Sequence, residues 1–161
     1  MPNWCSNTFT IRGKLETLKP IWDATQNEAD VKFLDAMAPI GEWDYGTAVE
    51  AWGTKWDVNT EGMEFSDLGD GTAEITGFFD SAWSPPIAAF TTLCANDNDV
   101  YAELYYFEPG MAFVGYWDSE GADDHYDIDM DKEDMGIPAH LNEFFNVDSW
   151  YEVEEEEVSE E

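Results

Sequence analysis

Basic side chains are scarce in this sequence, and their scarcity excludes several classes of function. Six of the 161 residues are Lys or Arg, against 37 Asp and Glu, so the formal net charge at pH 7 is −31. Such a field repels nucleic acid and anionic membranes, whereas it attracts cations and basic proteins. We therefore expect no direct binding of nucleic acid or of a membrane. The basic residues are Arg12, Lys14, Lys19, Lys32, Lys55 and Lys132.

Cysteine, histidine and long apolar runs are also few. Cys5 and Cys94 cannot form a disulfide framework, and buried reduced thiols are their expected state. His125 and His140 lie far from both cysteines, without the spacing of zinc ligands. No apolar run approaches the length of a membrane span, and the first residues lack the basic and apolar regions of a signal peptide. We expect a cytoplasmic protein.

The sequence also contains no recognisable catalytic motif. Cys5 could act as a nucleophile only if a base and a positive environment lowered the pKa of its thiol, and so acidic a chain favours the opposite. We therefore expect that the protein is not an enzyme and that it needs no cofactor.

Aromatic and aliphatic residues, by contrast, are plentiful. Hydrophobic residues make up 43% of the chain and include 8 Trp, 10 Phe and 7 Tyr, which is ample material for a buried core. We expect one domain over residues 1–150, with an acidic loop at 118–136, and an acidic, disordered tail at 151–161.

Hydrophobic periodicity predicts the elements of this domain. Strands are expected over 8–12, 56–65, 72–79, 100–107 and 111–118, and helices over 17–25, 30–37, 84–95 and from 138 onward. The Gly- and Trp-rich segment 41–55 is expected to be a loop. The order is that of an α+β, ferredoxin-like (split βαβ) fold, in which two helices cover an antiparallel sheet. The 100–118 hairpin and a short helix would extend it.

A fixed corner follows the third predicted strand. Ser84 is a helix N-cap candidate, and Pro85 would occupy the first helical position, where its missing N–H costs nothing. Ile87, Phe90 and Cys94 then repeat at the spacing of one helix face. We expect this strand–corner–helix unit to form the centre of the core.

Four segments stand out in order along the chain: MPNWCSN at 1–7, WGTKWD at 52–57, TGFFDSAWSPP at 76–86 and YYFEPGM at 105–111. Together they resemble the YubB-like family of phages and plasmids. The resemblance extends to about residue 120, and it implies a ferredoxin-like domain encoded by a mobile element and acting inside a bacterial cell. It implies no particular activity.

The carboxylates after Trp117 are the main indication of function. We expect them to bind a basic, DNA-handling host protein, as a DNA mimic that competes with phosphates for Lys and Arg. DNA carries one charge per about 1.7 Å, so a charge of −31 matches roughly 15 base pairs. Adaptation to high salt is an alternative source of the acidity. The expected protein-binding residues are Asp118, Glu120, Asp123, Asp124, Asp127, Asp129, Asp131, Glu133 and Asp134.

A small-ligand site is an alternative function. Trp52 and Trp56 flank Lys55 and could line a ligand groove, or they could pack as a loop with a Lys–Trp contact. Tyr101, Tyr105 and Tyr116 could lie on a sheet face as RNA-binding aromatic residues do, but so acidic a chain argues against RNA.

A cation site is a further alternative. Asp127, Asp129 and Asp131 alternate like the first ligands of a calcium loop. An EF-hand loop then requires Gly and Glu where this chain has Lys132 and Pro138, so a solvated acidic loop is the stronger expectation.

Overall fold

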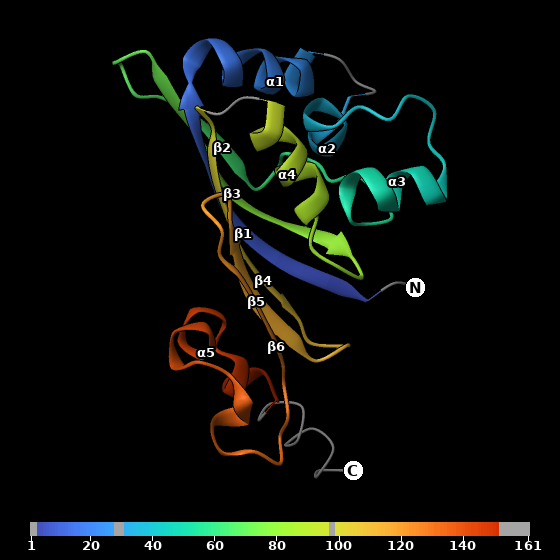
Figure 1. Cartoon of the computed structure of the whole chain (residues 1–161), viewed down its shortest axis with the longest axis vertical. Helices are drawn as coiled ribbons and strands as arrows, with labels where there is room; N and C mark the ends of the chain where they lie inside the picture. Colours follow the sequence, from blue (N-terminus) through green and yellow to red (C-terminus); the bar gives the residue numbers. More distant parts are fainter. Residues whose placement is uncertain (1–2, 28–30, 97–98, 152–161) are drawn as a thin grey trace.

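One antiparallel sheet runs the length of the molecule in a computed structural model that describes residues 3–27, 31–96 and 99–151 (Figure 1). The strands lie in the order β2-β3-β1-β4-β5-β6, and each neighbouring pair is antiparallel. Their bounds are β1 Trp4–Lys14, β2 Met63–Asp67, β3 Thr72–Ala82, β4 Tyr101–Glu108, β5 Phe113–Asp118 and β6 Asp123–Asp127.

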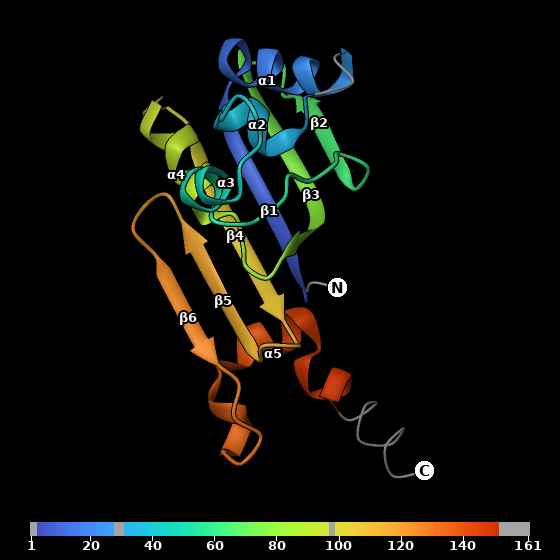
Figure 2. The ribbon, with the colours of Figure 1, turned by 90° about the vertical axis from the view of Figure 1, so that its right-hand side faces the viewer.

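Helices cover both faces of this sheet, at opposite ends. Helices α1 to α4 lie on one face over β2, β3, β1 and β4, and α5 lies on the other face near β5 (Figures 1 and 2). Their bounds are α1 Leu15–Asn27, α2 Phe33–Met37, α3 Tyr45–Trp52, α4 Ile87–Asn96 and α5 Ala139–Phe145, with a 3₁₀ turn, η1, at Glu133–Gly136. None of the described helices has the length and apolarity that a membrane span requires.

The succession β1-α1-β2-β3-α4-β4, arranged as β2-β3-β1-β4, is the ferredoxin-like topology. The predicted α+β fold is therefore confirmed. β5 pairs with β4 as the returning arm of the predicted hairpin, from Glu103 opposite Asp118 to Glu108 opposite Phe113. β6 then adds one more strand at that edge.

Four phenylalanines form the centre of the larger core, between the sheet and α1–α4. The ring of Phe9 in β1 lies 5.4 Å from Phe33, 5.5 Å from Phe79 and 5.8 Å from Phe90, measured between centroids. Such tilted and edge-on pairs add to the stabilisation from burial alone. The four rings connect β1, β3, α2 and α4 directly. The predicted strand–corner–helix unit, which contains Phe79 and Phe90, therefore lies at the centre of this core.

Two details of that corner differ from expectation. α4 begins at Ile87, two residues after Pro85. Ser84 does not cap it, because its Oγ donates a 2.5 Å hydrogen bond to the carbonyl of Gly53. The corner is therefore fixed by a bond to the end of α3, which the sequence pattern did not indicate.

Alternate residues of β4 enter two separate cores. Leu104 and Tyr106 belong to the larger core, whereas Phe107 points to the opposite face and packs with Val114 and Leu141 beneath α5. This follows from the two-residue period of a strand. The sheet is thus buried on both faces where β4 and β5 run side by side.

Two segments predicted as loops contain regular structure. Residues 41–55 include α3, whose N-cap Asp44 accepts the backbone N–H of Thr47 and whose C-cap Gly53 is left-handed. The acidic segment 118–136 includes β6 and η1. In addition, the strand predicted over 56–65 starts only at Met63. The first residue of the helix predicted at 30–37 and most of the predicted tail, 152–161, lie outside the described residues.

Candidate functional site

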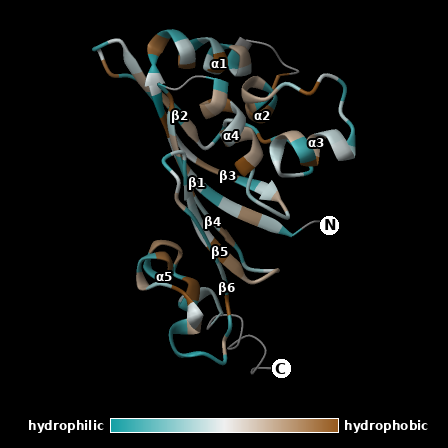
Figure 3. Ribbon diagram, in the orientation of Figure 1, coloured by the Kyte–Doolittle hydropathy of each residue, from teal (hydrophilic) through white to brown (hydrophobic). Residues whose placement is uncertain are grey.

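The nine carboxylates predicted to bind protein lie along one edge of the sheet. They lie at the end of β5, in the β5–β6 turn, on the edge strand β6, in the β6–η1 connection and in η1, and we call them the carboxylate edge. Seven of the nine are exposed, and Asp118 and Asp129 are half-buried. None forms a salt bridge with Lys or Arg in the described chain. Hydrophilic residues dominate the β6–α5 connection in Figure 3.

Asp118, one member of the carboxylate edge, also shapes the backbone. Asp118 accepts hydrogen bonds from the backbone N–H of Glu120 at 2.9 Å and of Ala122 at 3.1 Å, and from the hydroxyl of Tyr116 at 2.8 Å. Burial would raise the pKa of Asp118, but these hydrogen bonds outweigh it and lower the pKa. Asp118 thus stays ionised while it fixes the turn into β6.

The carboxylate edge does not form a metal centre. The described residues contain no group of three or more His, Cys, Asp and Glu side chains that could hold a metal ion. Asp127, Asp129 and Asp131 therefore do not converge. Asp129 instead accepts the backbone N–H of Asp131 at 3.0 Å, and Asp127 lies 3.6 Å from the imidazole of His125.

Of the second predicted site, Trp52 and Trp56 line one hollow, whereas Lys55 contacts Trp56 but is not among the residues that line it. Trp52 is 3% exposed, and its indole N–H donates to the carbonyl of Ala38 at 2.9 Å. The Lys55 ammonium lies 4.5 Å from the centre of the Trp56 ring, in cation–π geometry. We call the hollow beside them the tryptophan cleft. Its volume is about 440 Å³, and Trp43, Trp52 and Trp56 line it.

Asp57 supports the wall of this cleft and was not singled out from the sequence. Its carboxylate accepts the backbone N–H groups of Leu34 and Asp35, at the start of α2, and of Val58. Burial raises the pKa of Asp57, although these three hydrogen bonds oppose the shift. A carboxylate 23 residues from the helix it caps leaves no local signal in the sequence.

The tyrosines considered for RNA binding do share a sheet face, but their groups are already occupied. The hydroxyl of Tyr101 donates to Glu103 at 2.9 Å, and that of Tyr116 donates to Asp118. Tyr105 stacks on Phe144 with ring centroids 4.4 Å apart, beneath the end of α5. Carboxylates beside the rings oppose a phosphate backbone at this face.

The fold and these surfaces define a ferredoxin-like α+β protein with an acidic edge. The chain belongs to the family described as the ferredoxin-like domain in Api92-like protein, whose model matches residues 51–157. The match agrees with the domain that the YubB-like resemblance implied. No curated protein matches the chain.

One solved structure is similar to part of the chain. It is a crystal structure of a protein, Api92, from Yersinia pseudotuberculosis, with 20% sequence identity and a TM-score of 0.36. The match covers 52% of this chain and 29% of that one, so it spans less than a third of the Api92 protein.

Proposed function

We propose that this chain is a non-enzymatic binding protein of a phage or plasmid of the YubB-like type. It acts inside a bacterial cell and uses the carboxylate edge to bind a basic, DNA-handling protein of the host in place of DNA. The observation that carries this proposal is the seven exposed carboxylates that follow a free sheet edge without Lys or Arg partners in the described chain.

The charge balance of this region supports a basic partner. Residues 118–134 hold nine carboxylates and a single basic residue, Lys132. Elsewhere, Arg12, Lys14 and Lys19 form salt bridges of 2.6, 2.7 and 3.3 Å with nearby acids. Three of the six basic residues are thus paired with nearby acids, and the carboxylate edge, whose acids form no salt bridge with Lys or Arg within the described residues, is left to attract charge from a partner.

The test is capture of host proteins at low salt, followed by elution with a salt gradient. A partner that binds by counterion exchange elutes steeply as salt rises, as DNA-binding proteins do from DNA. DNA added to the loaded column should displace the same partner. Elution that is insensitive to salt, or a captured protein that DNA does not displace, would contradict the proposal.

Two matched variants locate the surface. The edge variant carries Asp123→Asn, Asp124→Asn, Asp127→Asn and Asp131→Asn. The control variant carries Glu16→Gln, Glu42→Gln, Glu50→Gln and Glu64→Gln, four exposed acids elsewhere, so both variants lose the same charge. The edge variant should lose the partner and the control should keep most of it. Equal losses would indicate a general effect of net charge.

The edge variant also distinguishes two roles of the carboxylates: binding a host protein and preventing β6 from pairing with other chains. Charged side chains on an edge strand prevent pairing with other chains. If neutralisation causes self-association but leaves capture of the host protein unchanged, the carboxylates protect β6, and the proposed function is wrong.

Small-ligand binding in the tryptophan cleft is the second candidate function. The cleft volume of about 440 Å³ lies within the range of small-molecule sites, and Trp43 and Trp56, on its walls, are 49% and 38% exposed. Quenching of tryptophan fluorescence by a metabolite library, compared between the wild type and Trp56→Ala, tests it.

A further inference from the structure

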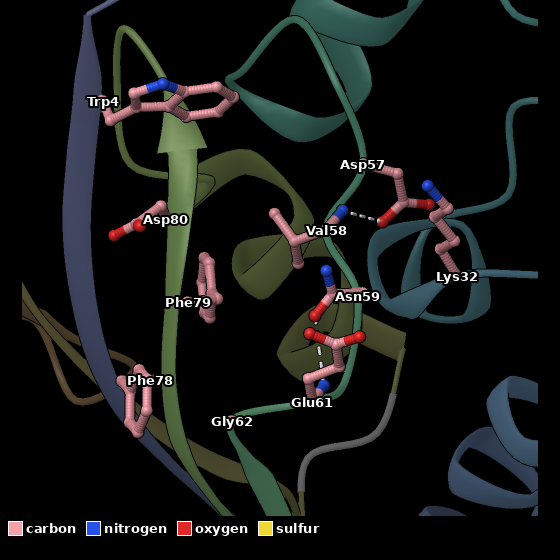
Figure 4. A pocket seen from close by; sticks show the side chains of 10 residues that line it. All are labelled: Trp4, Lys32, Asp57, Val58, Asn59, Glu61, Gly62, Phe78, Phe79 and Asp80. Atoms are coloured by element: carbon pink, nitrogen blue, oxygen red, sulfur yellow. Dashed lines mark hydrogen bonds between the residues drawn. The ribbon is translucent and has the colours of Figure 1, made fainter.

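β3 carries an unpaired edge beside a hollow, at the end of the sheet far from the carboxylate edge. β2 pairs with β3 only as far as Met63 opposite Gly77, so residues 78–82 of β3 have no strand partner on that side within the described chain. The segment 57–62 runs past them and leaves a cavity of about 410 Å³ (Figure 4). We call this cavity the β3 slot.

Two hydrogen bonds show toward which neighbour the N–H and C=O groups of β3 point. The N–H of Trp83 donates to Asn3 on the β1 side, whereas the N–H of Phe78 donates to the carbonyl of Gly62 on the β2 side. Because these groups alternate along an antiparallel strand, Asp80 turns both its N–H and its C=O toward the slot. The carbonyl of Ala82, which faces the same way, accepts the hydroxyl of Thr54 at 2.7 Å.

The slot is therefore closed at both ends and open in the middle. At one end Gly62 bonds to Phe78, and at the other Thr54 bonds to Ala82. Between them the backbone of Asp80 meets no strand. One residue of an inserted extended chain could exchange two hydrogen bonds with Asp80, which is the geometry of a hydrogen-bonded antiparallel pair.

Exposed aromatic rings surround this edge. Trp4, Trp83 and Phe78 are 45%, 44% and 66% exposed, and the ring of Trp4 lies 6.2 Å from that of Trp56. Large exposed aromatic side chains gathered in one place mark interaction surfaces, and Trp is among the residues that contribute most to binding energy. In the slot itself, Val58 and Phe79 supply an apolar floor.

The charges that line the slot select the partner. Asp57, Glu61 and Asp80 contribute three carboxylates, and Lys32 is the single cation in the lining. Lys55 lies on the face of Trp56, whose ring is 6.2 Å from that of Trp4, so one indole beside the slot already holds a cation at close range. An extended segment with alternating apolar and basic side chains would place apolar groups over Val58 and basic groups beside the carboxylates.

We propose that the β3 slot binds an extended, basic segment of another protein as an added strand, paired with the backbone of Asp80. This site is distinct from the carboxylate edge and does not depend on the function proposed for it. A second binding surface would allow one chain to contact two basic segments or two proteins.

The probe is a dye-labelled nine-residue peptide in which Val alternates with Arg, measured by fluorescence anisotropy in 150 mM salt. Its matched control has the same side chains and charge but is N-methylated at every residue, so that no register offers an N–H to Asp80. We expect N-methylation to weaken binding about tenfold, because it removes backbone hydrogen bonds. Equal affinity of the two peptides would show charge attraction alone and would overturn the proposal.

Variants locate the peptide. Asp80→Pro removes the N–H that faces the slot, and should weaken binding about tenfold, whereas Asp80→Asn keeps that N–H and should change it less than about threefold. Trp4→Ala should weaken binding, and Trp150→Ala, at another exposed tryptophan, should not. In the unmodified protein, the peptide should slow hydrogen exchange at the amide of Asp80, a readout that needs no variant. Unchanged exchange there would contradict the proposal.

The edge variant distinguishes the two proposals. The edge variant should still bind the unmethylated peptide more tightly than the N-methylated peptide, because its β3 slot is intact. If it abolishes peptide binding instead, the peptide binds at the carboxylate edge, and the slot proposal fails while the proposed function stands.

Discussion

The carboxylate of Asp57 accepts a hydrogen bond of 2.7 Å from the backbone N–H of Leu34, and so caps a helix from outside it. The same carboxylate accepts from Asp35 at 2.9 Å. Asp57→Ala should lower the free energy of unfolding by about 2 kcal/mol, because donors at the start of α2 lose their acceptor. Asp57→Asn, which keeps one carbonyl oxygen, should cost about half as much. Urea unfolding measures both, with Asp44→Ala, a single cap on α3, as the comparison.

The pH dependence of stability should report the raised pKa of Asp57. Burial is the main cause of the shift, so between the raised pKa and the ordinary value of about 3.9 the folded state binds more protons than the unfolded state. The contribution of Asp57 to the free energy of unfolding therefore grows as pH falls through this window. The wild type should gain stability relative to Asp57→Asn between pH 7 and pH 4. A constant difference would contradict the shift.

Gly77 should tolerate no side chain. Its φ is +145°, and a Cβ there would meet the backbone of Gly62 and Met63. Gly77→Ala should therefore lower the free energy of unfolding by about 3 kcal/mol, because strain and a backbone clash add. Gly69→Ala is the control, since Gly69 also has a positive φ of +83° but no atom within 4 Å of its Cβ position. Similar costs at both sites would mean that backbone conformation alone matters.

The two thiols should differ in reactivity toward an alkylating reagent. Cys5 is fully buried, and burial raises its pKa well above the ordinary value, with the carboxylate of Glu108 adding to the shift. Cys94 is half-buried, and burial raises its pKa too. At pH 8, Cys94 should react more slowly than a free thiol, and Cys5 should react only on unfolding. Mass spectrometry of the labelled sites, with Cys94→Ala as a control, distinguishes them.

Salt should stabilise the protein. At a net charge of −31 the folded state repels itself, and the screening length falls from about 30 Å at 0.01 M salt to about 10 Å at 0.1 M. The melting temperature should rise over this range. The rise should be smaller in the edge variant than in the control variant with four changed glutamates, because the carboxylate edge concentrates the repulsion. Equal rises in the melting temperatures of the two variants would show that only the total net charge affects stability, and not its position.

The ferredoxin-like core could be predicted from the sequence because each of its helices and strands buries one face, which leaves a periodic pattern of apolar residues. In the first part of β3 and of β4, buried residues alternate with half-buried ones, and the period-2 pattern is visible. β6 has no such pattern, because four of its five residues are exposed and it is held by backbone pairing to β5. Its own side chains therefore gave no indication of a strand.

Other features were missed for two reasons: a local capping signal was passed over, or the contacts that form the feature join distant parts of the sequence. α3 contains Gly46 and follows a Gly- and Trp-rich stretch, yet Asp44 and Gly53 bracket it with ordinary capping geometry, a signal that could have been used. For the candidate sites, residue types predicted the carboxylate edge and the Trp52–Trp56 pair. The β3 slot could not be predicted, because recognising it requires the pairing register of β1, β2 and β3, and no local sequence pattern contains that register.

β4 fixes its register twice over. Leu104 and Tyr106 need the larger core and Phe107 needs the smaller one, so a slip of one residue would misplace all three. β6 is exposed at four of its five residues, so its alignment depends on its pairing with β5 and on the contacts of His125 with Tyr106 and Phe113. The sheet thus passes from a strand whose register is determined by two cores to an edge strand held by few side-chain contacts, and three of the nine carboxylates, Asp123, Asp124 and Asp127, lie on that edge strand.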